Sequence, residues 1–588
     1  MADLTFTEKM ADIFEKVTSV GKVVLNILPG GAFSFGQETV RGVPLRVFKT
    51  LPPALGTYYA QWFDVWGDRE WLVYEGQRIT FREARAMYEA AGAELVGNAH
   101  FGIRKGDRVG IAMRNYPELL ISFLAITAAG GVAVPLNALW TAEELAYAVG
   151  DAACKVVIAD PPRLKLLATF QAKQGFRTIA VRGEDASGTG ALPWDAVLAQ
   201  GAARVAADPK AARRVLRAVG AEDEAMVMYT SGSTGFPKGV VHTQRSVGTA
   251  MKVGELAAKV KPDPDGVQLM AVPLFHITAL CPIGLFSIPM GSKIIMMRKW
   301  DPAEALRVIP AERVTRFTGV PTMMMDLMQH PDWAPEKVET LRGVVAGGAP
   351  VPPSQVAEMR AKSKKIQSGQ GYGLTETMAL GTVNQGADYL RHPKSCGRPV
   401  PLMVEIAILD PENGNKPVPE GQRGEVCIKG AMVMKGYNGL PEKTAEAIDA
   451  NGYFHSGDIG KMEGGFVYIL DRMKDLIIRG GENIDCSEIE AAMAEHPAVR
   501  ECSVFGLPDA RLGEVVGAAV WVTDPAVDGA VLAAQAAKTL AKFKVPAPEN
   551  IFLLKEQLPK GPTGKLDKKG MRVHYGEIVA KRPIKAKL

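Results

Sequence analysis

Residues 226–239, MVMYTSGSTGFPKG, combine glycines, hydroxyl side chains and one lysine in a pattern that suits a polyphosphate ligand. An apolar, strand-like run leads into a loop whose glycines let backbone N–H groups come close to a ligand. Ser231, Ser233 and Thr234 add hydroxyl donors, and Lys238 adds a positive charge. A flexible linker is the alternative, but linkers do not usually follow a buried strand or contain a Pro-Lys pair.

The residues around the lysine separate this loop from the Walker A loop. That pattern has glycine directly before the lysine and serine or threonine directly after it. Here Pro237 precedes Lys238 and Gly239 follows it. We therefore expect the loop to bind phosphate but do not expect a P-loop NTPase.

The elements that must hold this loop follow an alternating pattern from about residue 78. Amphipathic helical segments alternate with short apolar strands, which predicts an α/β fold with parallel strands, crossover helices and strands buried on both faces. The predicted strands include 108–113, 132–136, 155–160, 293–297, 316–320 and 343–348, and the predicted helices include 81–99, 117–130 and 142–152. Shorter strand-like pieces in about 396–470, separated by turn residues, predict a β-rich subdomain. A domain boundary is expected near 471–475.

Size and composition limit the class of protein. A chain of 588 residues exceeds what one hydrophobic core usually serves, so at least two domains are expected. A net charge of +5 spread over this length, without a dense basic stripe, argues against a nucleic-acid partner. The six cysteines form no C-x-x-C pair, which fits a reducing compartment and predicts no zinc or redox motif.

Two uncharged runs raise the question of a membrane span. Residues 119–140 are interrupted by Gly130, Gly131 and Pro135, which predicts a helix followed by a strand. Residues 266–292 contain three prolines and a histidine, whereas a spanning helix needs about 20 predominantly apolar residues. We expect buried segments and no transmembrane span. The N-terminus has no apolar signal core, so a cytoplasmic location is expected.

Five segments together resemble the adenylate-forming (ANL) superfamily, in its acyl-CoA synthetase and fatty-acid–CoA ligase branch. They are YTSGSTGFPKG (229–239), GQGYGLTE (369–376), YFHSGD (453–458), DRMKDLIIRGGENI (471–484) and PKGPTGKL (559–566). They occur in the family's order and spacing, and the similarity spans nearly the whole chain.

The resemblance implies a fold and a reaction. The fold is a large N-terminal core, residues 1–472, made of parallel sheets with helices plus a β subdomain, joined by a hinge to a small, mobile α+β domain, residues 473–588. The reaction uses ATP, Mg²⁺ and coenzyme A: a carboxylate attacks the α-phosphate, and a thiol then displaces AMP from the acyl-adenylate. A carboxylic acid with a pKa of about 4 is already ionised at neutral pH, so no general base is needed.

The resemblance also assigns site residues. Tyr372 resembles the ring that stacks on adenine, Thr375 binds the α-phosphate, and Glu376 holds Mg²⁺. Asp458 and Arg472 resemble contacts to the ribose hydroxyls. The alternatives are a solvated charge for Glu376, a turn aspartate for Asp458 and a surface ion pair for Arg472. The other implied nucleotide contacts are Thr230, Ser231, Gly232, Ser233, Thr234, Gly235, Lys238, Gly347, Gly348, Ala349, Gly371 and Gly373.

The second half of the chain supplies the expected moving parts. Lys565 resembles the family's catalytic lysine, whose ammonium group would stabilise charge on the α-phosphate; a solvated loop lysine is the alternative. Lys474 matches the hinge, and Gly480 and Gly481 would line the tunnel for the pantetheine arm of coenzyme A. His276 is expected between the acyl pocket and that tunnel, with a core histidine as the alternative.

The acyl substrate is less well defined by these residues. Acetate-activating relatives carry tryptophan at the position of Gly373, so glycine predicts an open pocket, and the methionines of 320–325 add adaptable side chains. A medium- or long-chain fatty acid is expected. The alternatives are an aryl acid, a free-standing adenylase that passes the acyl group to a carrier protein or an amine, and a nucleotide-binding protein without catalysis. A homodimer is compatible with the sequence, and Ala586–Lys587–Leu588 resembles a peroxisomal address if the source is eukaryotic.

Overall fold

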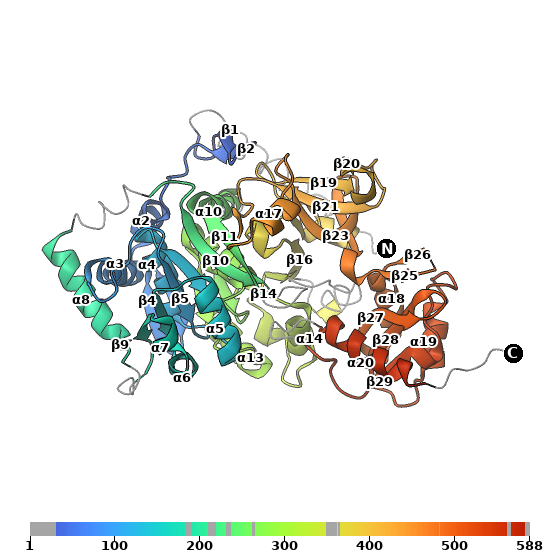
Figure 1. The fold of residues 1–588 in the computed structure, drawn as a ribbon. Helices are drawn as coiled ribbons and strands as arrows, with labels where there is room; N and C mark the ends of the chain where they lie inside the picture. Colours follow the sequence, from blue (N-terminus) through green and yellow to red (C-terminus); the bar gives the residue numbers. More distant parts are fainter. Residues whose placement is uncertain are drawn as a thin grey trace.

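A large N-terminal domain and a small C-terminal domain make up the molecule, which we describe from a computed structural model (Figure 1). The described residues are 31–183, 190–209, 219–230, 237–260, 265–347, 361–362, 365–480, 482–560 and 566–582. A hairpin of β1 (Phe35–Val40) and β2 (Val43–Phe48) opens the described chain. It lies at the top of the large domain, while the small domain lies at the right-hand end of the view.

The first large sheet carries the glycine-rich loop. Its strand order is β22 (Gly436–Tyr437), β11 (Lys238–Thr243), β10 (Glu224–Thr230), β6 (Val132–Pro135), β5 (Arg108–Ala112), β7 (Val156–Ala159), β8 (Arg177–Ala180) and β9 (Leu192–Pro193). The strands from β10 to β9 are parallel, as predicted, and β11 and β22 join antiparallel at one edge.

The second large sheet carries the start of the segment GQGYGLTE, residues 369–376. Its order is β18 (Arg398–Pro399), β17 (Thr382–Gln385), β16 (Gln367–Tyr372), β15 (Gly343–Gly347), β14 (Arg316–Gly319), β12 (Val267–Met270), β13 (Lys293–Met296), β3 (Glu70–Tyr74) and β4 (Gln77–Thr80). The strands from β16 to β3 are parallel. The carboxyl ends of parallel strands share one edge, which is where α/β proteins bind ligands.

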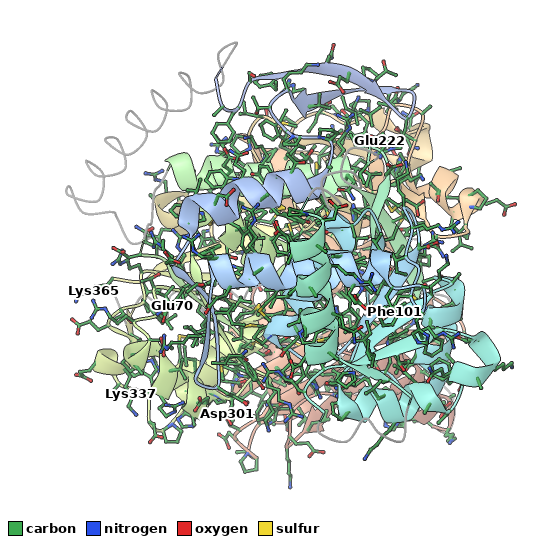
Figure 2. The ribbon with its side chains drawn as sticks, turned by 90° about the vertical axis from the view of Figure 1, so that its left-hand side faces the viewer. Glu70, Phe101, Glu222, Asp301, Lys337 and Lys365 are labelled. Atoms are coloured by element: carbon green, nitrogen blue, oxygen red, sulfur yellow. The ribbon has the colours of Figure 1, made fainter. Side chains whose placement is uncertain are left out.

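Helices cover both sheets and meet in a shared central layer. They are α2 (Leu55–Trp66), α3 (Phe81–Gly97), α4 (Pro117–Ala128), α5 (Ala142–Asp151), α6 (Pro161–Ala168), α7 (Gln171–Gln174), α8 (Trp194–Ala207), α10 (Gln244–Val260), α13 (Pro302–Ala311), α14 (Pro321–Gln329) and α16 (Gly386–Arg391). Thr80 and Glu83 form a capping box at the start of α3, which explains why that helix begins there. Figure 2 views the helical side of the domain, with Phe101 labelled just after α3.

Alternating side chains on the strands explain the layers. Met226 and Met228 of β10 belong to the central core, whereas Val227 and Tyr229 belong to the core beneath α5 and α6. The same period of two places Ile294 of β13 in the central core and Ile295 against α13 and α14. Strands that bury both faces read as continuous apolar runs, which is why the sequence predicted them.

The two uncharged runs are buried elements of the fold. Residues 119–140 contain most of α4 and all of β6. The second run contains β12, α11 (Ile277–Ala279), the π-helix η1 (Leu280–Leu285) and α12 (Phe286–Met290). Across the part of the chain that the structure describes, no helix is both long and apolar enough to cross a bilayer.

The β-rich subdomain and the C-terminal domain follow in sequence. The subdomain sheet has the order β20 (Lys416–Pro417), β19 (Glu405–Asp410), β21 (Gly424–Lys429), β23 (Phe454–Glu463) and β24 (Phe466–Arg472), with α17 (Pro441–Ala447) inserted before β23. After the 3₁₀ turn η5 (Met473–Asp475), the last sheet contains β26 (Glu482–Ile484), β25 (Ile477–Arg479), β28 (Gly513–Val522), β27 (Val499–Asp509) and β29 (Ile551–Leu554). The helices α18 (Cys486–Ala494), α19 (Gly529–Ala536) and α20 (Lys568–Ala580) pack on it.

Candidate active site

The glycine-rich loop connects the two strands of a hairpin. Thr230 at the end of β10 lies opposite Lys238 at the start of β11, so the loop is closed by the sheet itself. The Nζ atom of Lys238 lies 4.1 Å from the centre of the Tyr437 ring on β22. Such a cation–π contact holds the ammonium group at the base of the loop. The predicted contacts Ser231, Gly232, Ser233, Thr234 and Gly235 lie outside the described residues.

Glu376 lies beside this lysine on a 3₁₀ turn, η3 (Thr375–Thr377), that follows β16. Its side chain is buried, and the Tyr437 hydroxyl donates to its Oε1 at 2.9 Å. Burial raises the pKa of Glu376, while hydrogen bonds and the charges of Lys238 and Arg472 oppose that shift. A buried carboxylate next to a phosphate loop fits Mg²⁺, which is commonly held by one or two carboxylates and substrate phosphates.

His242 is a site residue that the sequence did not reveal. It is fully buried on β11, and its Nε2 lies 2.7 Å from the carbonyl oxygen of Thr375. Its Nδ1 lies 3.1 Å from Ser246 Oγ. Burial lowers the pKa of His242 to about 4, so the ring is neutral at pH 7 and donates from Nε2 to the carbonyl. The contact joins the two large sheets, and only tertiary structure brings these residues together.

A second cluster joins the end of β16 to the β subdomain. The hydroxyl of Tyr372 donates to Asp458 Oδ2 at 2.7 Å, and Arg472 Nε lies 3.1 Å from Oδ1. Asp458 and Arg472 face each other across β23 and β24. Burial, followed by the charge of Asp458, raises the pKa of Tyr372 above its usual range. Three residues from separate motifs therefore share one hydrogen-bonded group.

Glycines at the ends of β15 and β16 allow close packing of the backbone. Gly347 and Gly371 are neighbours in register, and a Cβ on Gly347 would lie no closer than 3.6 Å to another heavy atom. A Cβ on Gly373 would lie 2.3 Å from the carbonyl carbon of Ala379. Gly373 is thus required by local backbone packing, and the open acyl pocket stays a prediction. Gly348 and Ala349 lie outside the described residues.

The methionines expected to line an acyl pocket have a structural role. Met324 is buried in the core formed by α13, α14 and the outer face of the second sheet. Met323 packs against both this core and the central one. His276 caps α11, its ring centre 4.7 Å from that of Phe275, and is partly buried. Tyr437 contacts both Lys238 and Glu376, and the charge of Arg472 from the Asp458 group acts on Glu376, while His276 stands on a separate element.

Lys474, the predicted hinge residue, lies close to the group formed by Tyr372, Asp458 and Arg472. Lys474 is in η5, and burial lowers its pKa, with the charge of Arg472 as the next cause. Gly480 has a φ of 61° and its N–H donates to the carbonyl of Leu512 at 2.8 Å, so this position favours glycine. Gly481 lies outside the described residues, as does Lys565.

The base of the segment that carries Lys565 is described on both sides. Lys560 and Leu566 form a β-bridge, and the N–H of Asp567 donates to the carbonyl of Pro559 at 2.9 Å. Lys560 pairs with Glu501 at 2.6 Å, and Lys568 pairs with Glu490 at 2.7 Å. The described residues on either side of 561–565 are thus held by β27, through Glu501, and by α18, through Glu490.

A two-domain α/β fold with a lysine, a buried carboxylate and a polar cluster at the strand ends defines a nucleotide-dependent enzyme. The chain belongs to the AMP-binding enzyme family: the family model matches residues 59–438, and the model of the family's C-terminal domain matches residues 488–565. The long-chain-fatty-acid–CoA ligase FadD13 of Mycobacterium tuberculosis is 33% identical over 543 residues, covering 92% of this chain and 99% of that protein.

Two further relatives show how broad the similarity is. A feruloyl-CoA synthase from Amycolatopsis sp is 35% identical over 477 residues, covering 81% of this chain and 90% of that protein. The crystal structure of ATP-bound MatB from Rhodopseudomonas palustris is 31% identical with a TM-score of 0.77, covering 89% of this chain and 99% of that one. The predicted family, fold and enzyme class are therefore confirmed.

Proposed function

We propose that this protein joins a carboxylic acid to coenzyme A in two steps, through an acyl-adenylate, with release of pyrophosphate and AMP. The arrangement of Lys238, Glu376 and Asp458 carries the proposal. These groups offer a cation at the start of β11 in the first sheet, a carboxylate able to bind a metal just after β16 of the second sheet, and a hydroxyl acceptor on β23 of the β subdomain. A nucleoside triphosphate needs each of them.

The chemistry follows from what these side chains can stabilise. In the first step a carboxylate oxygen bonds to the α-phosphorus and the bond to pyrophosphate breaks. Both reactants are anions, so the enzyme must hold them in line and neutralise charge on the phosphates. We propose that Lys238 supplies one cation and Lys565 a second, and that Thr375 contacts the α-phosphate. Mg²⁺ on Glu376 would shield the phosphates from the incoming carboxylate.

The second step moves the acyl group to sulfur. The thiol of coenzyme A bonds to the acyl carbon with loss of its proton, and the bond to AMP breaks. We propose that Lys474 and the Gly480–Gly481 backbone serve this step after the small domain has turned, with the arm of coenzyme A passing beside Gly480. The φ of Gly480 and the position of Lys474 beside Arg472 support these roles.

For the substrate, we propose a medium- or long-chain fatty acid. The similarity to a long-chain-fatty-acid–CoA ligase over 99% of that protein's length supports it. The feruloyl-CoA synthase, at 35% identity, makes an aryl acid the second candidate. We further propose a cytoplasmic location, which the free thiols of all six cysteines support.

The full-length protein can be tested with a panel of octanoate, palmitate, benzoate and ferulate. We expect AMP release that requires both an acid and coenzyme A, with the highest kcat/KM for a fatty acid. A highest value for ferulate would assign the protein to the aryl-acid ligases. AMP release that is indifferent to coenzyme A would support transfer to a carrier protein or an amine instead.

A further inference from the structure

An irregularity in the pairing of β21 and β23 directs Asp458 toward Tyr372 and Arg472. Along β21 and β23, Glu425 pairs with Ile459 and Cys427 pairs with His455. Residues 456–458 therefore stand opposite Val426 alone and form a bulge. Bulges of this kind redirect a side chain, and here the redirected side chain is Asp458.

The bulge is held by side chains on both of its strands. Ser456 Oγ donates to the carbonyl of Val426 at 2.5 Å and accepts from the N–H of Asp458 at 3.0 Å. The N–H of Gly457, whose φ is 71°, donates to Glu425 Oε1 at 2.8 Å. Every residue of the bulge therefore takes part in a specific hydrogen bond.

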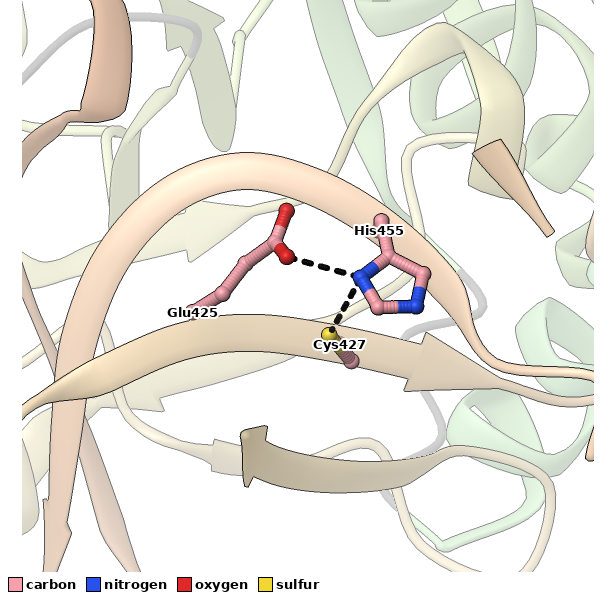
Figure 3. A group of neighbouring side chains, drawn as sticks. All are labelled: Glu425, Cys427 and His455. Carbon is pink, nitrogen blue, oxygen red and sulfur yellow. Dashed lines mark hydrogen bonds and ion pairs between the residues drawn. The ribbon is translucent and has the colours of Figure 1, made fainter. Parts of the chain in front are cut away.

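Glu425 contacts both the bulge, through Gly457, and the residue before it. Its second oxygen, Oε2, lies 2.7 Å from His455 Nδ1, on the residue that precedes the bulge (Figure 3). The carboxylate is buried, and on the other side of the ring Asp449 lies 4.0 Å from Nε2. A buried carboxylate that contacts a backbone N–H and an imidazole nitrogen makes charge-assisted bonds, which are short and directional, and the hydrogen bond with Glu425 raises the pKa of His455.

We propose that Glu425 is a positioning residue of the nucleotide site: through Gly457 and His455 it sets the bulge, and so the direction from which Asp458 meets the ribose hydroxyls. Asp458 in turn accepts from Tyr372 and pairs with Arg472, so a shift of the bulge would disturb the whole cluster. This inference rests on the proposed ribose contact of Asp458.

The same side chains invite a different interpretation, a metal site. Glu425, Cys427 and His455 offer three ligand atoms within 4.8 Å of one another, and Figure 3 shows them facing a common point. The 2.7 Å separation of Oε2 and Nδ1 is that of a shared proton, and Oε1 is already occupied by Gly457. Burial raises the pKa of the Cys427 thiol above its usual range, which keeps the thiol neutral. These observations favour a positioning network.

The test is the preference of the enzyme for ATP over 2′,3′-dideoxy-ATP, because only a group acting on the ribose hydroxyls changes this ratio. In Glu425→Gln we expect the ratio of the two kcat/KM values to fall about tenfold, mainly through the KM for ATP. Glu94→Gln is the matched control: Glu94 is a fully buried glutamate on α3 that pairs with Arg204 at 2.6 Å. It should lower stability without changing the ratio.

Three further measurements decide the outcome. Asp458→Asn should also reduce the ratio; if it does not, the proposed ribose contact fails rather than the role of Glu425. His455→Asn leaves both Glu425 and Gly457, and thus their hydrogen bond, in place. We expect it to reduce the ratio about threefold. This variant provides the test if Glu425→Gln does not fold. An unchanged ratio in folded Glu425→Gln, or in His455→Asn, would overturn the proposal. Stoichiometric zinc in the purified protein, lost in Glu425→Gln, would also overturn it.

Discussion

At the scale of single residues, the site depends on buried polar groups whose partners come from distant parts of the chain. Glu376 receives one hydrogen bond from Tyr437 and feels the charges of Lys238 and Arg472, yet burial still raises its pKa. A buried carboxyl in this state is held at the expense of stability, since its ionised form is better solvated in the unfolded chain. The proposed role of Glu376 in holding Mg²⁺ would explain why a destabilising buried carboxyl is present at this position.

Glu376→Gln should make this trade-off visible. Because the pKa of Glu376 is raised on folding, its ionisation destabilises the protein, and stability is lost as pH rises from the unfolded pKa through the folded one. At pH 8 we expect the free energy of unfolding of the glutamine variant to exceed that of the wild type by on the order of 1 kcal/mol. We also expect the variant to lose adenylation.

Urea unfolding at pH 8 and pH 5 would check this expectation. The gain in the variant should be smaller at pH 5 than at pH 8, because the raised pKa of Glu376 makes the wild-type carboxyl take up its proton at a higher pH in the folded protein than in the unfolded chain. Glu463→Gln, an exposed residue paired with Lys461, is the control and should change neither stability nor activity. A variant that is less stable at pH 8 would contradict the account.

At the scale of elements, the ends of two parallel strands form the proposed nucleotide site. β15 ends in Gly347, which lies in register with Gly371 near the end of β16, and η3 (Thr375–Thr377) follows β16 after Gly373 and Leu374. The glycines differ in their surroundings: Gly347 has room for a methyl group, and Gly373 has none. The same residue type thus meets two different needs at the ends of neighbouring strands.

Gly373→Ala and Gly347→Ala form a matched pair that tests this difference. The new methyl group at 373 would meet the backbone of Ala379, so we expect a loss of about 1–3 kcal/mol in the free energy of unfolding. At 347 we expect a change within about 0.5 kcal/mol, with a higher KM for ATP if adenine passes beside this strand. Denaturant titration and ATP kinetics on both variants would separate the two effects, and equal destabilisation would contradict the packing argument.

At the scale of the whole molecule, the two domains are joined by a short connection with several polar contacts. Asp471 at the end of β24 accepts from the backbone N–H of Cys486 at the start of α18. Arg423 of the β subdomain pairs with Asp485 at 3.0 Å. These contacts hold the small domain against the large one, and η5 with Lys474 lies between them.

The two half-reactions should respond differently to changes on either side of this connection. We expect Lys565→Ala to abolish adenylate formation but to leave thioester formation from supplied acyl-AMP within about twofold, because the lysine stabilises charge in the first step only. Lys474→Pro should spare adenylation and slow the second step at least about tenfold, because it stiffens the hinge. Pyrophosphate exchange and thioester assays measure the two steps separately. Equal losses in both steps for Lys565→Ala would refute its assigned role.

Much of the fold was readable from the sequence because its signals are local. Continuous apolar runs predicted the parallel strands β5, β6 and β7, and turn residues between shorter strands predicted the β subdomain. The motifs that contain Lys238, Glu376 and Asp458 were also found, because glycines, hydroxyls and charges at fixed spacing are visible without a structure. The roles of Lys565 and Lys474 remain predictions.

Tertiary structure decided what the local signals could not express. His242 looks like an ordinary residue at the end of a strand until its ring meets the carbonyl of Thr375, 133 positions away. Gly373 could be interpreted from the sequence only by resemblance, and the structure adds that the backbone of Ala379 leaves no room for a side chain there. In the sequence Glu425 is one charged residue among many, whereas in the structure it accepts a hydrogen bond from Gly457 in the bulge that contains Asp458. Sequence patterns report which side chains alternate or repeat, whereas burial and hydrogen bonding depend on the distant segments that folding brings beside them.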